Sequence, residues 1–308
     1  MAFFSIITPT YNRAAMLHIA IDSILNQSFT DWELLIIDDG STDNTKEVVC
    51  SYNDTRIKYI YQKNSERSAA RNNGINSSNG TYICFVDSDD YYTADRLEKL
   101  YEEIKKREFP IAFFYTGICF EKNGIAVKRD EWPNTFKSMK DYFIINVTGS
   151  PQVCIHKNIL QKHKYNETIS IAEDTELWVR IISDGFPVIF IDQYTVIATN
   201  HIGRSVNEVT GNSYIDALKV MKLIFSKNHQ GHNINKKVKR IVKSGICFGI
   251  ARYNIYNCIR FKALYYLIKS ILINPIEIQS KHKFFLIFKV LISKKNKISG
   301  IRKYIDNE

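Results

Sequence analysis

Paired cysteines and long apolar runs are both missing from this chain of 308 residues. The six cysteines are scattered without a Cys-x-x-Cys pair, so we do not expect a zinc site, and we interpret all six as reduced core residues of a cytosolic chain. No apolar run reaches the roughly 18 residues that a membrane-spanning helix needs. The first residues lack a basic segment and a cleavage site, which favours a strand over a signal peptide.

Several motifs of nucleotide-binding and hydrolytic sites are also absent. There is no Gly-x-x-x-x-Gly-Lys-Ser/Thr sequence and no Gly-x-Gly-x-x-Gly sequence after an expected strand, which disfavours P-loop and dinucleotide-binding folds. The sequence contains neither a serine nucleophile elbow nor His-Glu-x-x-His. Serine-hydrolase and zinc-protease sites are therefore poorly supported.

Acidic residues are scarce in the last third of the chain. From residue 212 onward there are 20 Lys or Arg and 4 Asp or Glu, a net charge of +16, whereas the preceding part carries −6. An acidic front and a basic back suggest two different tasks. The basic part is expected to meet an anionic partner, either a membrane surface or nucleic acid.

Short apolar runs alternate with helical patterns in the first part of the sequence. The spacing predicts strands at residues 3–8, 32–37, 57–61 and 81–86, with helices between them. This alternation is typical of βαβ units. We therefore predict an α/β domain with a mostly parallel sheet flanked by helices.

The pattern is less regular after residue 86. It predicts in turn a helix, a strand, an irregular segment, a helix and a strand, at about 93–108, 111–120, 130–150, 174–183 and 187–198. Basic helical patterns follow. We expect a catalytic domain at residues 1–211 and a basic helical region at 212–308.

Polar clusters follow three of the expected strands, at Thr10-Tyr11-Asn12, Asp38-Asp39 and Asp87-Ser88-Asp89-Asp90. Parallel sheets bind ligands beyond the carboxyl ends of their strands, so the clusters predict a binding site there. Asp87 and Asp89 place two carboxylates close together, and their hard oxygens suit Mg²⁺ or Mn²⁺, which in turn bind a diphosphate. The alternative is that these acids only cap the next helix.

The Asp38-Asp39 pair has two interpretations. In one, Asp-Asp-Gly-Ser forms a turn and a helix cap. In the other, one carboxylate accepts a hydrogen bond from the N–H of a nucleotide base. The spacing alone leaves both open.

Four motifs then occur in order between residues 5 and 90: Ser5-Ile-Ile-Thr-Pro-Thr-Tyr-Asn12, Leu34-Leu-Ile-Ile-Asp-Asp-Gly-Ser-Thr-Asp43, Ala69-Ala-Arg-Asn-Asn-Gly-Ile75 and Phe85-Val-Asp-Ser-Asp-Asp90. Together they resemble the family 2 glycosyltransferases with the GT-A fold. Ala172-Glu-Asp-Thr-Glu-Leu-Trp-Val-Arg180 is similar to the acceptor-side Glu-Asp motif of that family. The resemblance covers about residues 3–205. It implies a donor-binding part at about 1–110 and an acceptor side at about 111–211.

The resemblance also implies roles for the matching residues. Asp39 would read the edge of uracil or another base. Arg67 and Arg71 lie where basic residues approach the donor, although Arg71 is alternatively a structural helix residue. Asp87 would contact the ribose with Ser88 beside it in the donor site, and Asp89 would bind the metal together with Asp87. The nucleotide pocket would be lined by Thr8, Pro9, Tyr11 and Asn12.

The acceptor-side motif would supply the general base. Inverting transfer needs one base to take the proton of the acceptor hydroxyl, and we assign that role to Asp174 rather than to Glu173. The alternative is an acidic first helical turn, which the helix dipole favours. In relatives, a polar or basic segment at the position of His201 and Arg204 can close over the diphosphate. His201 is therefore a candidate metal ligand and Arg204 a candidate phosphate ligand. The alternative is that both are ordinary loop residues.

Apolar residues recur at helical spacing in the basic region, with Lys262 and Lys269 off that face. Residues 284–292 lie between lysines, and as a helix they would span about 14 Å, half the ~30 Å hydrocarbon thickness. These apolar residues either lie in a membrane interface or are buried in the core of the protein. Nucleic acid is not expected, because the aromatics are not interleaved with arginine. The stripe consists of Phe261, Leu264, Tyr265, Ile268, Ile271 and Leu272.

We therefore predict a metal-dependent inverting glycosyltransferase, cytoplasmic and peripheral at the inner face of the cell membrane. It would move a sugar from a nucleoside diphosphate sugar, UDP-linked, to a saccharide or lipid-linked saccharide in surface-polysaccharide synthesis. One alternative is a nucleotidyltransferase, which would need a Gly-rich loop where this chain has Thr-Pro-Thr-Tyr-Asn-Arg. The other is a non-catalytic nucleotide-sugar-binding protein, which would have lost Asp87, Asp89 or Asp174.

Overall fold

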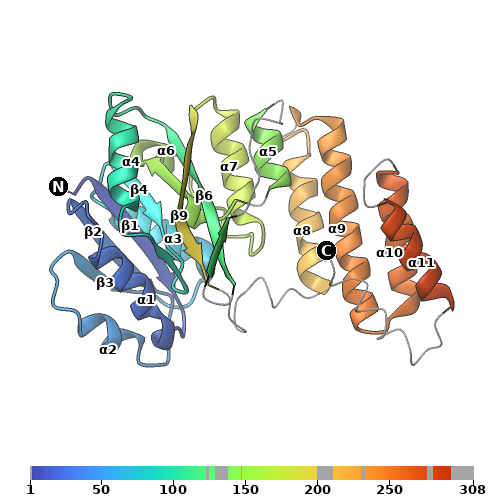
Figure 1. Ribbon diagram of the computed structural model, residues 1–308, viewed down its shortest axis with the longest axis horizontal. Coiled ribbons are helices and arrows are strands. Elements are labelled where there is room, and N and C mark those ends of the chain that lie inside the picture. The colour runs from blue at the N-terminus through green and yellow to red at the C-terminus, as the bar shows by residue number, and fades with distance from the viewer. Residues whose placement is uncertain are drawn as a thin grey trace. The chain divides into compact units, whose positions relative to one another are not determined.

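The computed structural model describes residues 2–122, 125–128, 138–146, 148–199, 211–229, 233–275 and 280–292. The chain divides into two compact units (Figure 1). Unit 1 comprises Met1–Met139 and Asn146–Arg204, and unit 2 comprises Lys140–Ile145 and Ser205–Glu308.

Unit 1 is built on one mixed sheet with the strand order β3-β2-β1-β4-β8-β6-β9-β5, and β7 pairs with β6. β1, β2, β3 and β4 are parallel to one another, and β8 joins β4 to β6 in antiparallel orientation. The strands are β1 (Phe4–Thr10), β2 (Trp32–Asp38), β3 (Ile57–Tyr61), β4 (Tyr82–Phe85), β5 (Asp90–Tyr92), β6 (Phe113–Lys122), β7 (Ile125–Lys128), β8 (Val153–His156) and β9 (Val188–Ala198).

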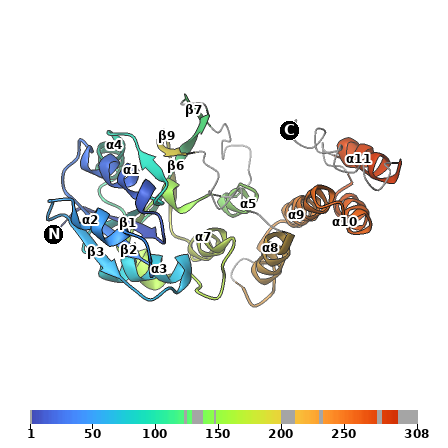
Figure 2. The same cartoon turned by 90° about the horizontal axis from the view of Figure 1, so that it is seen from below.

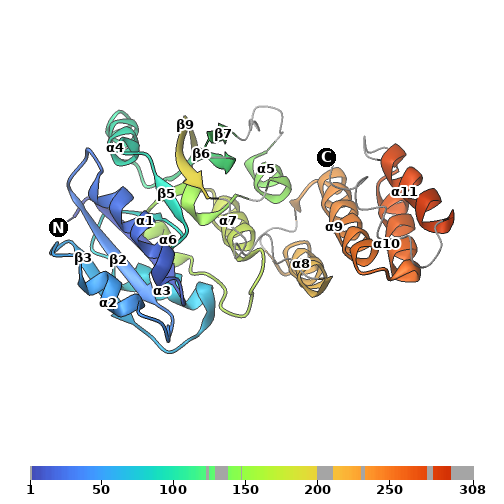
Figure 3. The same cartoon turned by 60° about the horizontal axis from the view of Figure 1, so that its bottom comes forward.

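Helices cover both faces of this sheet (Figures 2 and 3). Side chains of α1, α2 and α4 share one core cluster with alternate residues of β1, β2 and β4, while α3 packs on the opposite face against β1 and β2. The helices of unit 1 are α1 (Ala14–Leu25), α2 (Thr45–Cys50), α3 (Glu66–Ser77), α4 (Arg96–Lys105), α6 (Lys157–Lys162) and α7 (Glu173–Ser183).

The close contact between α3 and β1 depends on Gly74. A Cβ atom added there would lie 2.5 Å from Cγ2 of Ile7, well inside van der Waals contact. The glycine therefore lets the backbone of α3 approach the sheet. This approach fixes the depth at which the side chains of the preceding turn, Arg71 among them, sit in unit 1.

The predicted α/β class is confirmed, and the parallel part of the sheet is its first half. In the second half β6 and β9 are parallel, whereas β5, β7 and β8 pair antiparallel with their neighbours. The prediction of an irregular segment at 130–150 was wrong for α5 (Met139–Ile145). Its apolar residues Tyr142, Phe143 and Ile144 are consecutive, so they show no helical period.

The described residues of unit 2 form four long helices besides the residues of α5. They are α8 (Gly211–Ile224), α9 (Lys236–Tyr256), α10 (Arg260–Ile273) and α11 (Ser280–Ile292). α9 packs against α8 and α10, and α10 packs against α11, around a core that includes Phe248, Leu267 and Leu286. Among the described residues, no helix combines the length and apolar character needed to cross a bilayer.

The expected apolar stripe of the basic region is split by the fold. Ile271 is buried and Leu264 half-buried, so these two belong to the core. Phe261, Tyr265, Ile268 and Leu272 are exposed.

The interpretation of all six cysteines as core residues was wrong for two of them. Cys50 and Cys258 are exposed, whereas the other four are buried, and all six thiols are free. Cys50 is the last residue of α2, and Cys258 lies in the turn between α9 and α10 with φ +59°. Side chains at helix ends and in turns are often exposed to solvent, even where the residue type favours burial.

A buried carboxylate joins three strands at the amino edge of the sheet. Glu33 accepts hydrogen bonds from the Ser5 hydroxyl at 2.6 Å and the Lys58 ammonium at 2.7 Å, and from both the backbone and the side chain of Asn79. Burial alone would raise the pKa of Glu33, but these donors lower it to about 2. Glu33 therefore ties β2 to β1, to β3 and to the loop before β4.

Replacing Glu33 by Gln should lower the free energy of unfolding by about 3 kcal/mol at pH 7. Because the pKa of Glu33 is depressed on folding, its contribution is complete above pH 4.5 and is lost as the pH falls toward 2. The two proteins should therefore differ little near pH 2. Urea unfolding across this pH range measures the difference, with the exposed Glu102→Gln as control. A pH-independent deficit would contradict the prediction.

Candidate active site

The parallel strands bring the polar clusters to one edge of the sheet. Thr10 at the end of β1 is paired with Asp38 at the end of β2, and Asp38 is paired with Tyr61 at the end of β3. Ile7 of β1 is paired with Phe85, the last residue of β4 and two residues before Asp87. All these ends are carboxyl ends, where a parallel sheet binds its ligand.

The loop after β1 is bound to the loop after β2. Asn12 adopts φ +51°, its backbone N–H donates to Ser41 at 2.9 Å, and its side-chain oxygen accepts from the Thr42 backbone at 2.8 Å. Tyr11 is 49% exposed beside it, and Pro9 is half-buried. The hydroxyls of Thr8 and Thr10 are buried without a hydrogen-bond partner among the described residues. Asn12 thus connects the loops after β1 and β2.

The two carboxylates after β2 do different things. Asp38 accepts from the Ser41 backbone at 2.8 Å and from the Tyr59 hydroxyl at 2.5 Å, so it is the residue that holds the turn. Asp39 accepts from Gln62 at 2.7 Å and from the Ser65 backbone at 2.9 Å, both on Oδ1. Its Oδ2 has no hydrogen-bond partner within the described part of the chain, so that oxygen can accept a bond from a ligand.

The acids after β4 do not cap the next helix. α4 begins at Arg96, and its N-cap residue is Asp95. Asp90 instead opens β5 and accepts from the Thr199 backbone at 3.2 Å. Ser88 is buried, whereas Asp87 and Asp89 are only half-buried. The capping interpretation of this cluster was therefore wrong.

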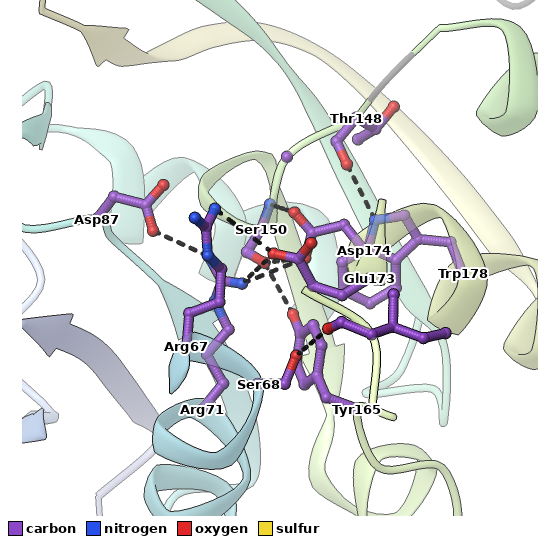
Figure 4. Close-up of polar contacts among 12 residues, drawn as sticks. Arg67, Ser68, Arg71, Asp87, Thr148, Ser150, Tyr165, Glu173, Asp174 and Trp178 are labelled. Carbon is purple, nitrogen blue, oxygen red and sulfur yellow. Dashed lines mark hydrogen bonds and ion pairs between the residues drawn. The ribbon is translucent and has the colours of Figure 1, made fainter. Parts of the chain in front are cut away.

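Arg71 of α3 connects this cluster to α7 (Figure 4). Its guanidinium lies 3.1 Å from Asp87, 3.1 Å from Glu173 and 3.7 Å from Asp174. The Arg71 side chain is only 5% exposed, so the three carboxylates surround a cation withdrawn from water. Arg71 therefore pairs with protein carboxylates, as its alternative interpretation as a structural helix residue required.

Burial and neighbouring negative charges raise the pKa values of two carboxyl groups around the Arg71 guanidinium. Burial, with Asp89 and Asp174 nearby, raises the pKa of Asp87 although Arg71 opposes the shift. Burial and the adjacent Asp174 likewise raise the pKa of Glu173 against Arg71 and Arg67. A cluster of perturbed carboxyl groups at a strand end is a common property of functional sites.

Asp174 is held by Ser150, the first residue of a short 3₁₀ helix, η2 (Ser150–Gln152). The Ser150 hydroxyl donates to Oδ1 of Asp174, and the Ser150 backbone N–H donates to Oδ2 at 3.1 Å. Tyr165 contacts the same serine hydroxyl at 2.8 Å. The Asp174 side chain is 16% exposed and that of Glu173 only 6%, so Asp174 is the more accessible carboxylate.

Backbone strain marks the start of α7. Ala172, directly before Glu173, has φ +56°, a left-handed conformation that costs a non-glycine residue on the order of 1 kcal/mol. The following acids form the first turn of the helix, as the macrodipole interpretation proposed. They also pair with Arg71, so an acidic first turn and a shared cation occur together.

Ser150 and Tyr165 were not predicted from the sequence. Ser150 carries no motif and precedes Pro151 in a stretch expected to be irregular, and Tyr165 lies between predicted elements. Arg67 is 45% exposed and only 3.8 Å from Glu173, so it remains able to reach a ligand. His201 and Arg204 lie outside the described residues.

A metal held by protein side chains alone does not fit this edge. The described residues contain no group of three or more His, Cys, Asp or Glu arranged to hold an ion. Asp87 and Asp89 nevertheless offer hard oxygens at the strand end. Mg²⁺ and similar ions are commonly held by one or two carboxylates together with substrate phosphates and water. The donor set fits an ion that arrives with a diphosphate.

Comparison with known sequences identifies the family. The sequence model of "Glycosyl transferase family 2" matches residues 5–169. The chain belongs to this family. The match includes the loops after β1, β2 and β4 and the turn of α3 that carries Arg71.

Curated relatives of this family 2 glycosyltransferase span most of its length. A "GalNAc(5)-diNAcBac-PP-undecaprenol beta-1,3-glucosyltransferase" of Campylobacter jejuni is 28% identical over 277 residues, 86% of this chain and 86% of the relative. An uncharacterised glycosyltransferase of Methanocaldococcus jannaschii is 28% identical over 76% of this chain and 80% of its own.

Solved structures confirm the GT-A fold. The TarS 1–349 fragment of S. aureus, in complex with UDP-GlcNAc, superposes with a TM-score of 0.65 over 98% of this chain and 92% of that chain, at 19% identity. A mannosyltransferase of Pyrobaculum calidifontis, in complex with GDP-Man and Mn²⁺, gives a TM-score of 0.58 over 99% of this chain and 85% of its own, at 13% identity.

Replacing Arg71 of the glycosyltransferase by Met should cost about 3 kcal/mol or more of unfolding free energy at pH 7, because buried carboxylates lose their cation. The cost should shrink at lower pH, where the same carboxylates take up protons. Arg67→Met is the matched control, and because Arg67 is exposed it should cost less than about 1 kcal/mol. Chemical denaturation measures both. Equal costs for the two variants would show that Arg71 is not the central cation.

Proposed function

We propose that this glycosyltransferase transfers a sugar, with inversion, from a nucleoside diphosphate sugar to a saccharide or lipid-linked saccharide in surface-polysaccharide synthesis. The C. jejuni relative is named for a polyprenol-linked acceptor, which supports this acceptor class. The TarS complexes contain UDP-GlcNAc or UDP, which supports a UDP-linked donor. The reaction fits a cytoplasmic enzyme peripheral at the inner face of the cell membrane.

The donor would lie along the carboxyl edge of the parallel strands. Oδ2 of Asp39 would accept a hydrogen bond from a base N–H, because Oδ1 already accepts from Gln62 and Ser65. The nucleotide pocket would be lined by Thr8, Pro9, Tyr11 and Asn12, with Asp87 and Ser88 at the ribose. Arg67, exposed on α3, would approach the diphosphate.

One observation carries the proposal: Asp87 and Asp174 pair with the same guanidinium, at 3.1 and 3.7 Å. Asp87 belongs to the donor side and Asp174 to the acceptor side. Their joint contact with Arg71 supports a base that lies next to the donor cluster. Proximity of base and donor is what a direct displacement at the anomeric carbon requires.

Asp174 would act as the general base. Hydrogen bonds from Ser150 to both carboxylate oxygens fix its orientation, and its partial exposure leaves room for an acceptor hydroxyl. Glu173 is less suited, since it is almost fully buried and pairs with Arg71. Attack by the deprotonated hydroxyl from the face opposite the diphosphate inverts the anomeric configuration.

Asp89, with Asp87, would hold the Mn²⁺ or Mg²⁺ that accompanies the donor. The ion supplies positive charge beside the leaving diphosphate. The Mn²⁺ complex of the P. calidifontis mannosyltransferase supports this assignment. We assign Asp89 as the principal protein ligand and Asp87, which also pairs with Arg71, as the second.

Asp174→Asn should reduce transfer by about a hundredfold or more while donor affinity is unchanged, because an amide cannot take the proton. Product formation from a panel of UDP-sugars measures transfer, and calorimetry with UDP measures binding. Asp184→Asn, at the other end of α7, is the matched control. Transfer within tenfold of the unmodified enzyme would rule Asp174 out as base.

Asp89→Ala should weaken UDP binding in the presence of Mn²⁺ by at least tenfold, since the diphosphate loses its bridging cation. EDTA should produce a similar loss in the unmodified protein and little further loss in the variant. Calorimetry with and without Mn²⁺ distinguishes these cases. Equal UDP affinity in EDTA would remove the metal from the proposal.

A further inference from the structure

α10 carries apolar side chains on two opposite faces. Ala263 and Leu267 are fully buried in the core of unit 2. On the opposite side Phe261 is 86% exposed and Leu272 is 76% exposed, and Tyr265 and Ile268 lie between them at 57% and 47%. Steps of four, three and four residues place these side chains on one stripe of about 16 Å along the helix. The exposed stripe cannot be explained by the core of this unit.

α11 repeats the arrangement. Leu286 and Val290 are buried in the same core as α10. Four large apolar side chains of α11 are exposed by 39 to 60%: Phe284, Phe285, Phe288 and Leu291. Two packed helices therefore each present an aromatic face away from their shared core. Exposed apolar side chains gathered along one face of a helix are typical of an interaction site.

Cations accompany these faces. Lys262 is exposed beside Phe261, and the ammonium groups of Lys269 and Lys289 lie 5.3 Å and 5.2 Å from the ring centres of Tyr265 and Phe285. Asp216 is the one acidic residue in α8, α9, α10 and α11 as the structure describes them. The described residues of these four helices therefore carry a strong net positive charge, with a single carboxylate among them.

The first turns of α9 also carry several cations. Lys236, Lys237 and Arg240 are exposed there, and Lys239 and Lys243 lie nearby against the ring of Phe225. A helix amino end disfavours cations, so an anionic partner would stabilise this arrangement. The charge of unit 2 therefore favours a partner that brings negative charge.

We propose that the exposed faces of α10 and α11, which we name the aromatic faces, dock onto an anionic lipid surface. The aromatic and aliphatic side chains enter the headgroup and upper acyl region, and the flanking lysines contact lipid phosphates. The faces are each shorter than the bilayer is thick, so they lie along the surface.

A second copy of the chain fits these faces less well than lipid does. Pairing two aromatic faces would bring two sets of lysines together without carboxylates to neutralise them, which disfavours association. An anionic bilayer supplies the negative charge and an apolar layer at once. The inference rests on the proposed position at the membrane and is independent of the transfer reaction.

The test is co-sedimentation of the full chain with vesicles of phosphatidylcholine, alone or mixed with phosphatidylglycerol, at low and high salt. The chain should bind the mixed vesicles at low salt and bind less at high salt. Phe261→Ser with Leu272→Ser should weaken binding at least tenfold. Phe284→Ser with Phe288→Ser provides a second, independent variant of the same design.

Matched controls separate lipid contact from a general loss of exposed apolar surface. Tyr61→Ser with Ile125→Ser removes residues of unit 1 that are 61% and 67% exposed, and it should leave vesicle binding unchanged. Lys262→Gln should weaken binding to the mixed vesicles by about fivefold and leave binding to phosphatidylcholine unaffected. Circular dichroism and thermal unfolding verify that each variant is folded.

Three outcomes would overturn the inference. The first is a full chain that ignores phosphatidylglycerol at low salt. The second is unchanged binding in both folded serine variants. The third is an oligomer, detected by light scattering without lipid, that the serine variants dissociate, since the faces would then join copies of the chain. Transfer to a water-soluble acceptor should persist in the serine variants, so a failure of lipid binding and a failure of the proposed reaction remain distinguishable.

Discussion

The candidate site depends on one buried cation. Removing a guanidinium from water costs several kcal/mol, so Arg71 is stable in its position only where carboxylates converge on it. Asp87 in the loop after β4 and Glu173 at the start of α7 supply them, although Glu173 is 102 residues away from Arg71 along the chain. The ion pairs therefore require that the donor-side loop and the acceptor-side helix lie together.

The turn of α3 that carries Arg71 also orders the acceptor side through neutral contacts. Asn72 donates to the Tyr165 carbonyl at 3.0 Å and accepts from the Tyr165 backbone N–H at 2.9 Å. Tyr165 then reaches Ser150, and Ser150 holds Asp174. Since Gly74 sets the distance of this helix from β1, a single turn transmits the position of the parallel sheet to the candidate base.

Residues at strand ends could be predicted from the sequence, and residues that support them could not. A carboxylate after an apolar run is recognisable in the sequence itself, which is why Asp87 and Asp89 could be predicted, whereas the Glu173-Asp174 pair was assigned through the family resemblance. Ser150 acts through a contact that exists only after β8 inserts antiparallel between β4 and β6. Strands of three or four residues such as β5 and β8 have too few positions to show a period of two. The sequence therefore predicts neither these strands nor the role of Ser150. Arg71 was found by resemblance, but its burial came from the depth of α3 in the fold.

The first turn of α7 shows why two explanations of one motif need not compete. Each ionised acid near a helix amino end gains about 0.3 to 1 kcal/mol from the macrodipole. That gain partly offsets the electrostatic repulsion among Glu173, Asp174 and Asp87, which surround a single buried cation, Arg71. Glu173 uses its position to neutralise Arg71, and this leaves Asp174 bound mainly by the neutral donors of Ser150. A carboxylate oriented by neutral donors and partly open to solvent can meet a hydroxyl group, whereas one locked in a buried ion pair cannot. The helix dipole that favours an acidic first turn therefore also allows two adjacent acids to have different roles, with Glu173 pairing with Arg71 and Asp174 available to a hydroxyl group.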